Sequence, residues 1–212
     1  MIFCPGAVMM SDIKIFGIGL SRTGTTSCHC LMSRFGFSAV HYPSSFREIH
    51  DHVFSNDSPV SGRFEELDRL YPHSLFIYST REVEKWAQSC LKLFSSEKRL
   101  RSILSFSKDQ KKWYDYGDMN LYGRDLAGMK DIGRDELKTA YHRHEERVSR
   151  YFENKKARLL TIDFTDRASL PLSSLVRFLE KNGVMGMPHV NKGRDGYMSP
   201  YLKTGMARDT IS

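Results

Sequence analysis

The chain contains 212 residues, of which 40% are hydrophobic and 27% are charged. This composition excludes a wholly disordered chain and is sufficient for one domain with a buried core. Lysine and arginine outnumber aspartate and glutamate by 32 to 25, and the resulting net charge of +7 favours an anionic partner.

Apolar runs alternate with helical patterns along the chain. The runs at residues 13–18, 37–42, 74–79 and 157–164 are typical of buried parallel strands. Helices are expected at residues 25–35, 46–53, 62–70, 133–154 and 172–179, and from Thr80 onward, with Ser45 and Ser61 as N-caps. The alternation predicts an α/β fold, a three-layer sandwich with a mainly parallel central sheet.

The predicted elements fit one domain. We expect residues 1–12 to be an N-terminal extension, residues 13–195 to form the α/β domain and residues 196–212 to form a C-terminal tail. Residues 95–120 are polar and charged, and two interpretations of them stay open. They form either a solvated insertion or a lid over a substrate site, because substrate choice is often carried by such segments.

The sequence also limits the compartment and the partners. The four cysteines lack the spacing of a disulfide framework and no apolar run reaches transmembrane length. We therefore expect a cytoplasmic protein without stable membrane insertion. The basic residues are scattered, without interleaved aromatic residues, so no nucleic acid is expected as a partner. The motif Cys28-His29-Cys30 is not expected to bind a metal, because adjacent helical residues point in different directions.

The first predicted strand leads into a glycine-bounded loop with the features of an anion site. Gly19 permits a tight turn, and Gly24 lets a ligand approach the backbone at the start of the next helix, whose free N–H groups point into the loop. The spacing of these glycines matches a nucleotide-triphosphate P-loop, but Thr25 occupies the lysine position and Arg22 lies within the loop. This pattern favours a compact phosphate with one further anionic substituent over a triphosphate with magnesium.

A second candidate for anion binding follows the strand at residues 74–79. Arg81 lies at the carboxyl end of that strand, where open α/β sheets bind ligands, and Ser89 lies eight residues later. An arginine and a hydroxyl that converge there would bind a phosphate monoester.

Together, the two elements resemble those of the sulfotransferases that use 3′-phosphoadenosine-5′-phosphosulfate (PAPS). The resemblance is closest to the small branch with Asp-x-Pro, here Asp57-Ser58-Pro59, before the second element. Residues 188–193 are similar to the basic terminal loop of that family. The resemblance assigns PAPS binding to Ser21, Arg22, Thr23, Gly24, Thr25, Thr26, Ser27, Arg81, Ser89, Lys192 and Arg194.

The resemblance implies a P-loop-like fold and a PAPS-dependent sulfotransferase. The expected reaction moves a sulfuryl group to a hydroxyl or amine of a small-molecule or glycan acceptor, releasing adenosine 3′,5′-bisphosphate (PAP), without a metal. Arg22 would stabilise developing charge, and either Asp57 or His41 would be the base, although Asp57 is equally explained as a turn or cap residue. Two alternatives stay open: a P-loop nucleotide kinase, and a non-catalytic anion- or nucleic-acid-binding protein on the same fold.

Overall fold

The computed structural model describes residues 13–164 and 172–184, and its sheet has five strands. The strands are β1 (Ile15–Gly17), β2 (Ala39–His41), β3 (Phe54–Asn56), β4 (Leu75–Ser79) and β5 (Leu159–Ile162). The helices are α1 (Thr25–Arg34), α2 (Phe46–Asp51), α3 (Ser58–Ser61), α4 (Phe64–Leu70), α5 (Val83–Phe94), α6 (Glu97–Ser105), α7 (Lys108–Tyr122), α8 (Arg134–Tyr151) and α9 (Leu172–Lys181). Two short 3₁₀ helices, η2 (Gly128–Asp131) and η3 (Lys156–Arg158), precede α8 and β5.

All strand pairs in the sheet are parallel, and the order is β2-β3-β1-β4-β5. The α/β fold with a parallel central sheet is therefore confirmed. One strand is a correction: β3 was not among the four predicted strands, yet it lies between β2 and β1. It is only three residues long and follows a helical pattern closely, so no run of alternating or apolar residues identifies it.

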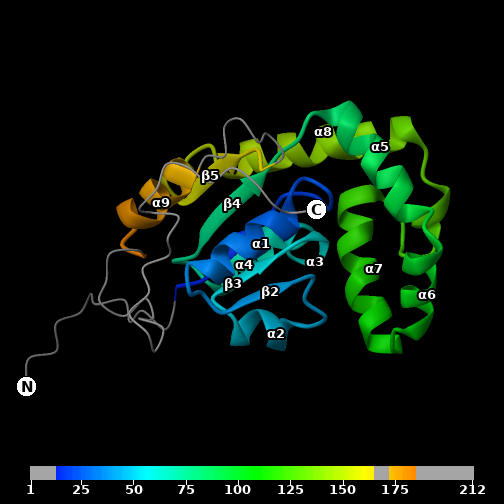
Figure 1. The fold of residues 1–212 in the computed structure, drawn as a ribbon, viewed down its shortest axis with the longest axis horizontal. Helices are drawn as coiled ribbons and strands as arrows, with labels where there is room; N and C mark the ends of the chain where they lie inside the picture. The colour runs from blue at the N-terminus through cyan, green and yellow to red at the C-terminus, as the bar shows by residue number, and fades with distance from the viewer. Residues whose placement is uncertain (1–12, 165–171, 185–212) are drawn as a thin grey trace, which may run out of the picture.

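Helices cover both faces of the sheet (Figure 1). Alternate residues of β1 and β4 point to opposite faces, as strand geometry requires. Ile15 and Ile77 pack with α1 and α9 on one face, whereas Phe16 and Phe76 pack with α4 and α8 on the other. A third apolar cluster, centred on the buried Trp86, joins α5, α7 and α8 beside the sheet. The sheet is therefore the middle layer between two layers of helices, which is the predicted three-layer sandwich.

Three predicted helix starts can be compared with the structure. Ser45 caps α2 as expected, because its hydroxyl accepts from the N–H of Glu48 at 3.2 Å. The other two starts were wrong. Ser61 is the buried last residue of α3, whose N-cap is Asp57, and α5 begins at Val83 after Glu82 rather than at Thr80. The acidic side chains of Asp57 and Glu82 accept the free N–H groups of α3 and α5, whereas α4, the helix that Ser61 was expected to cap, begins at Phe64 without a side-chain cap from the described residues.

The polar residues 95–120 form α6 and most of α7, which lie together beyond the edge of the sheet next to α3 (Figure 1). The contact between α3 and α7 is made by two glycines. A Cβ atom on Gly62 would lie 2.7 Å from the carbonyl oxygen of Gly117, so only glycine permits this approach. This close contact fixes α7 against the sheet domain.

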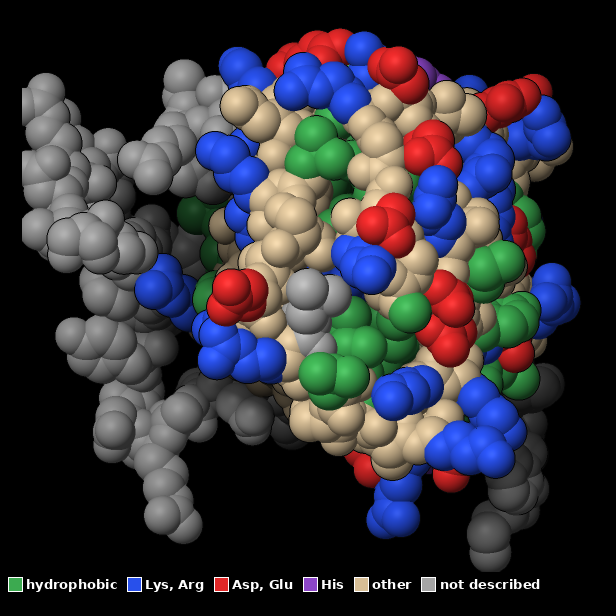
Figure 2. Space-filling model, turned by 90° about the vertical axis from the view of Figure 1, so that its right-hand side faces the viewer, with side chains coloured by type: hydrophobic (Ala, Val, Ile, Leu, Met, Phe, Trp, Pro, Cys, Tyr) green, Lys and Arg blue, Asp and Glu red, His purple; other side chains and the backbone are tan. Residues whose placement is uncertain are grey.

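The outer surface of this side of the molecule is mixed. Figure 2 shows lysine and arginine side chains interspersed with acidic and apolar ones across the face. In the described parts of the chain, no helix combines the length and the apolar character that crossing a membrane requires.

Candidate active site

The carboxyl ends of β1, β2, β3 and β4 all lie at one edge of the parallel sheet, and the candidate site is built there. Gly24 has φ +95° and is the N-cap of α1, and no side chain of the described residues caps this helix. A Cβ atom on Gly24 would lie 2.6 Å from the Cβ atom of Phe164, so a side chain does not fit. The first N–H groups of α1, from Thr25 to Ser27, are therefore left for an anionic ligand.

The loop before α1 is held by bonds to other elements. Thr23 is buried, and its hydroxyl donates to the carbonyl oxygen of Leu20 at 2.7 Å and bonds the Ser79 hydroxyl at 2.7 Å. The indole N–H of Trp86 donates to the carbonyl oxygen of Ser21 at 2.9 Å. The side chain of Thr23, one of the seven residues from Ser21 to Ser27 expected to bind the donor, thus shapes the loop from inside.

Arg81 and Ser89 lie on the same side of the sheet as the loop and contact it directly. The Nη1 atom of Arg81 donates to the carbonyl oxygen of Arg22 at 3.0 Å, and the Nε atom of Arg22 donates to the Ser89 hydroxyl at 2.9 Å. The Nε atom of Arg81 is buried without a hydrogen-bond partner among the described residues. Two guanidinium groups from distant segments therefore converge, and one retains an unused buried donor.

Asp57 and His41 form a pair beside the loop. The Nε2 atom of His41 lies 2.8 Å from the Oδ2 atom of Asp57, which also accepts from the Thr25 hydroxyl at 2.9 Å. The Oδ1 atom of Asp57 accepts from the Ser21 hydroxyl and from the N–H of Ser58. Both carboxylate oxygens are therefore occupied by donors. The cap interpretation of Asp57 holds as well, since the Ser58 bond is an N-cap of α3.

The two members of this pair differ in their access to solvent. The side chain of Asp57 is 7% exposed and that of His41 is 30% exposed. Burial by itself raises the pKa of Asp57, but the His41 ring and the bonds from Ser21 and Ser58 outweigh it and hold the pKa below its ordinary value. Asp57 is thus an ionised anchor, and His41 is the more accessible group.

Backbone strain is concentrated at this site. The non-glycine residues of the described chain with positive φ are Arg22 at +75°, Tyr42 at +60° and Asp57 at +84°. Such conformations are rare outside glycine and persist where the surrounding structure imposes them, often in functional sites. All three residues line the same cavity.

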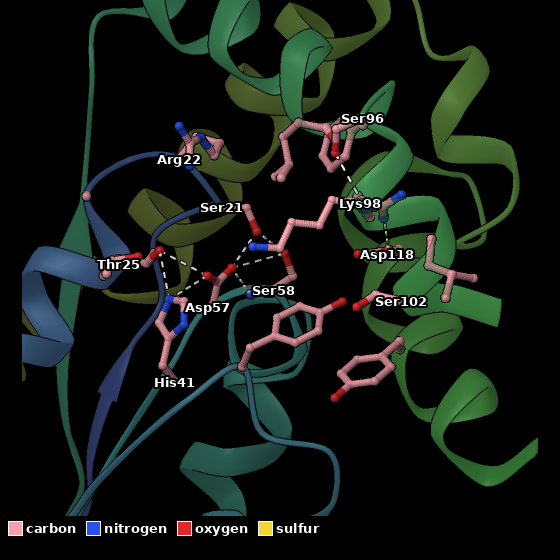
Figure 3. A pocket seen from close by; sticks show the side chains of 18 of the residues that line it. Ser21, Arg22, Thr25, His41, Asp57, Ser58, Ser96, Lys98, Ser102 and Asp118 are labelled. Carbon is pink, nitrogen blue, oxygen red and sulfur yellow. Dashed lines mark hydrogen bonds and ion pairs between the residues drawn. The ribbon is translucent and has the colours of Figure 1, made fainter. Parts of the chain in front are cut away.

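That cavity has a volume of about 690 Å³, which is within the usual range for small-molecule sites. The loop, His41 and Asp57 form one side, and Lys98, Ser102 and Asp118 from α6 and α7 lie on the other (Figure 3). No individual cavity residue of α6 or α7 was predicted from the sequence. For Asp118 a signal was present, because it shares a helical face with apolar Tyr114, Leu121 and Tyr122.

Comparison with known families agrees with this geometry. A family model described as a sulfotransferase domain matches residues 49–195, which is more than half of the chain. The chain belongs to the sulfotransferase-domain family. A comparison with curated proteins found no match. The matched segment of the chain includes Asp57, Arg81, Ser89 and Asp118, whereas the glycine loop and His41 precede it.

Two candidate residues and one motif from the sequence analysis lie outside this cavity or outside the described residues. Lys192 and Arg194 lie outside the described residues. In the motif Cys28-His29-Cys30, Cys28 is buried in the core and Cys30 is exposed. Among the described residues, no three His, Cys, Asp or Glu side chains are grouped to hold a metal ion.

Proposed function

We propose that this member of the sulfotransferase-domain family transfers a sulfuryl group from PAPS to a hydroxyl or amine of an acceptor bound in the cavity. The observation that carries the proposal is the convergence of the loop before α1 with Arg81 and Ser89 at one end of that cavity. A donor with anionic groups at two separate positions requires two such elements.

The residues present fit an anionic nucleotide in three respects. The N-terminus of α1 is uncapped and open at Gly24, Arg81 retains a buried N–H donor without a partner, and Arg22 adds a second positive charge. Thr25, in the position of the P-loop lysine, donates to Asp57 instead. This favours a phosphosulfate over a triphosphate, because no lysine stands there to bind a γ-phosphate.

When bound, PAPS supplies the sulfuryl group and leaves as PAP. The N–H groups of α1 and the guanidinium of Arg22 would hold the 5′ anionic groups, and Arg22 would stabilise the negative charge that develops there. Arg81 would donate to the 3′-phosphate, and the Ser89 hydroxyl, which accepts from Arg22, would donate its own proton to the same phosphate. These contacts fix the donor relative to the acceptor, and such positioning lowers the barrier.

His41 is proposed as the base that takes the proton from the acceptor. Asp57 is the weaker proton acceptor, because its oxygens are occupied by donors and its pKa is held low. Its carboxylate instead holds Nε2 of His41, which orients the ring and stabilises the imidazolium once the proton is transferred. The Nδ1 atom of His41 is then the nitrogen that accepts the proton.

The test separates donor binding from transfer. PAP should raise the melting temperature of the protein, whereas ATP with magnesium should not, since ligands stabilise in proportion to their affinity for the folded state. Transfer of labelled sulfate from PAPS is then measured across phenols, alcohols, sugars and amines. Stabilisation by ATP with magnesium but not by PAP would contradict the proposal and favour a kinase, and binding to DNA or RNA alone with steep salt dependence would favour a non-catalytic protein.

A further inference from the structure

Part of the cavity has an apolar wall that begins at Tyr42, the residue after His41. The rings of Tyr42 and Tyr114 stack with centroids 4.5 Å apart and planes at 11°, and Phe106 lies 4.8 Å from Tyr114. Burial raises the pKa of Tyr114 to about 12, so this phenol stays neutral. Leu93, Phe94 and Ile103 extend the wall. A flat ring system is the kind of ligand that packs against such a surface.

A charged pair with unused hydrogen-bonding groups lies beside this wall. Asp118 is 4% exposed and lines the cavity, yet its Oδ2 atom has no hydrogen-bond partner among the described residues. The nearest cation is Arg99, whose Nη2 atom lies 3.7 Å from that oxygen, too far for a hydrogen bond. The Nη1 atom of Arg99 is also buried without a partner in the described chain.

Buried polar atoms without partners are costly, so they indicate a missing partner. Above about pH 7, where Asp118 has lost its proton, a partner for this pair must donate to its carboxylate oxygen and accept from a guanidinium N–H of Arg99. A hydroxyl group does both with one oxygen atom. An ammonium group has no acceptor for Arg99, and a carboxylate or sulfate would be repelled by Asp118.

We propose that Arg99 and Asp118 form an anchoring subsite for a neutral hydroxyl group on a ring-bearing acceptor that carries at least two hydroxyls. The second hydroxyl of the same molecule would lie at His41 and receive the sulfuryl group. This inference rests on the proposed function for the transfer step, but the anchoring itself is a binding property. The acceptor class that follows from this subsite is an aromatic or alicyclic diol.

The subsite is fixed in position, which suits an anchor. Asp118 follows Gly117, and Gly117 packs directly on Gly62 of α3. Because Asp57 is the N-cap of α3 and Gly62 follows its last residue, the same short helix connects the subsite to the Asp57–His41 pair.

The experiment uses two matched pairs of ligands that differ only in the distal hydroxyl. These are 4,4′-dihydroxybiphenyl with 4-hydroxybiphenyl, and 2,6-dihydroxynaphthalene with 2-naphthol, with binding measured by calorimetry at about pH 8, where Asp118 is ionised. We expect the wild-type protein to bind at least one diol about 10- to 100-fold more tightly than its partner, since charge-assisted hydrogen bonds have this value. Asp118→Asn should reduce that ratio about tenfold, and Arg99→Gln, which keeps a donor, provides a second variant if the first fails to fold.

The control is Asp109→Asn, the same chemical change at an exposed position of α7, which should leave the ratio within about twofold of wild type. An unchanged ratio in both Asp118→Asn and Arg99→Gln, or the absence of discrimination in wild type for both ligand pairs, would overturn the subsite. The melting response to PAP is measured on the same samples. If the protein discriminates the diols but does not respond to PAP, the subsite is supported and the proposed donor is contradicted. If it responds to PAP but does not discriminate the diols, the donor is supported and the subsite is contradicted.

Discussion

Asp118 gives the protein a pH dependence of stability that can be calculated from its burial. Its carboxyl group has an ordinary pKa of 3.8, and burial raises the pKa to about 7 in the folded protein although Arg99 opposes the shift. Between these values the folded protein holds a proton that the unfolded chain releases. The free energy of unfolding therefore falls as pH rises from about 4 to 7. With each pH unit worth about 1.4 kcal/mol, the full effect reaches about 4 kcal/mol.

The substitution Asp118→Asn removes this titration while keeping the shape of the side chain. Relative to wild type, the variant should gain up to about 4 kcal/mol of stability between pH 4 and pH 8, because asparagine carries no charge to bury. Urea unfolding at several pH values, followed by the fluorescence of buried Trp86, gives both curves. Other groups titrate in both proteins and cancel in the difference.

The difference in unfolding free energy between wild type and Asp118→Asn, plotted against pH, tests whether burial keeps Asp118 protonated. A difference that stays constant within about 0.5 kcal/mol from pH 4 to pH 8 would show that Asp118 is not held neutral by burial. A wild-type protein that gained stability relative to the variant as pH rose would reverse the sign and refute the reasoning. Asp109→Asn, exposed on the same helix, serves as the control and should show no such trend.

Three further predictions test other parts of the molecule. His41→Ala should lower turnover about 10²- to 10⁴-fold, and added imidazole should restore part of it; loss without rescue would argue against a base at this position. Arg81→Ala should weaken PAP binding about 10- to 100-fold in calorimetry, whereas Arg22→Ala should chiefly slow turnover, and equal small effects would contradict the assigned roles. Burial lowers the pKa of His144 from 6.5 to about 4, so wild type should lose up to about 3 kcal/mol as pH falls through that window. His144→Gln, a donor that cannot titrate, should abolish this loss in acid unfolding measurements, and an unchanged acid slope would count against it.

Much of the proposed donor-binding region consists of residues that local sequence already singles out. The glycines of the loop, Arg22 within it and Arg81 after a buried run each follow from residue type and spacing. Parallel strands place their carboxyl ends at one edge, so two loops that follow such strands meet even though they are far apart in sequence. In the structure these two loops are joined by the hydrogen bond from Arg81 to the carbonyl oxygen of Arg22.

Only the tertiary structure decided the rest of the cavity. The strand β3 is too short to show a pattern, but its place between β2 and β1 brings Asp57 to His41. The close approach of α7 to the end of α3 depends on the contact between Gly62 and Gly117. The residues around each glycine in the sequence do not indicate this contact. Local preferences determined the loop before α1 and the turn at Arg81, for which anion binding is proposed, because both depend on the conformation of single turns. The pairs His41–Asp57 and Arg99–Asp118 depend on how distant elements pack, and packing is a property of the whole chain.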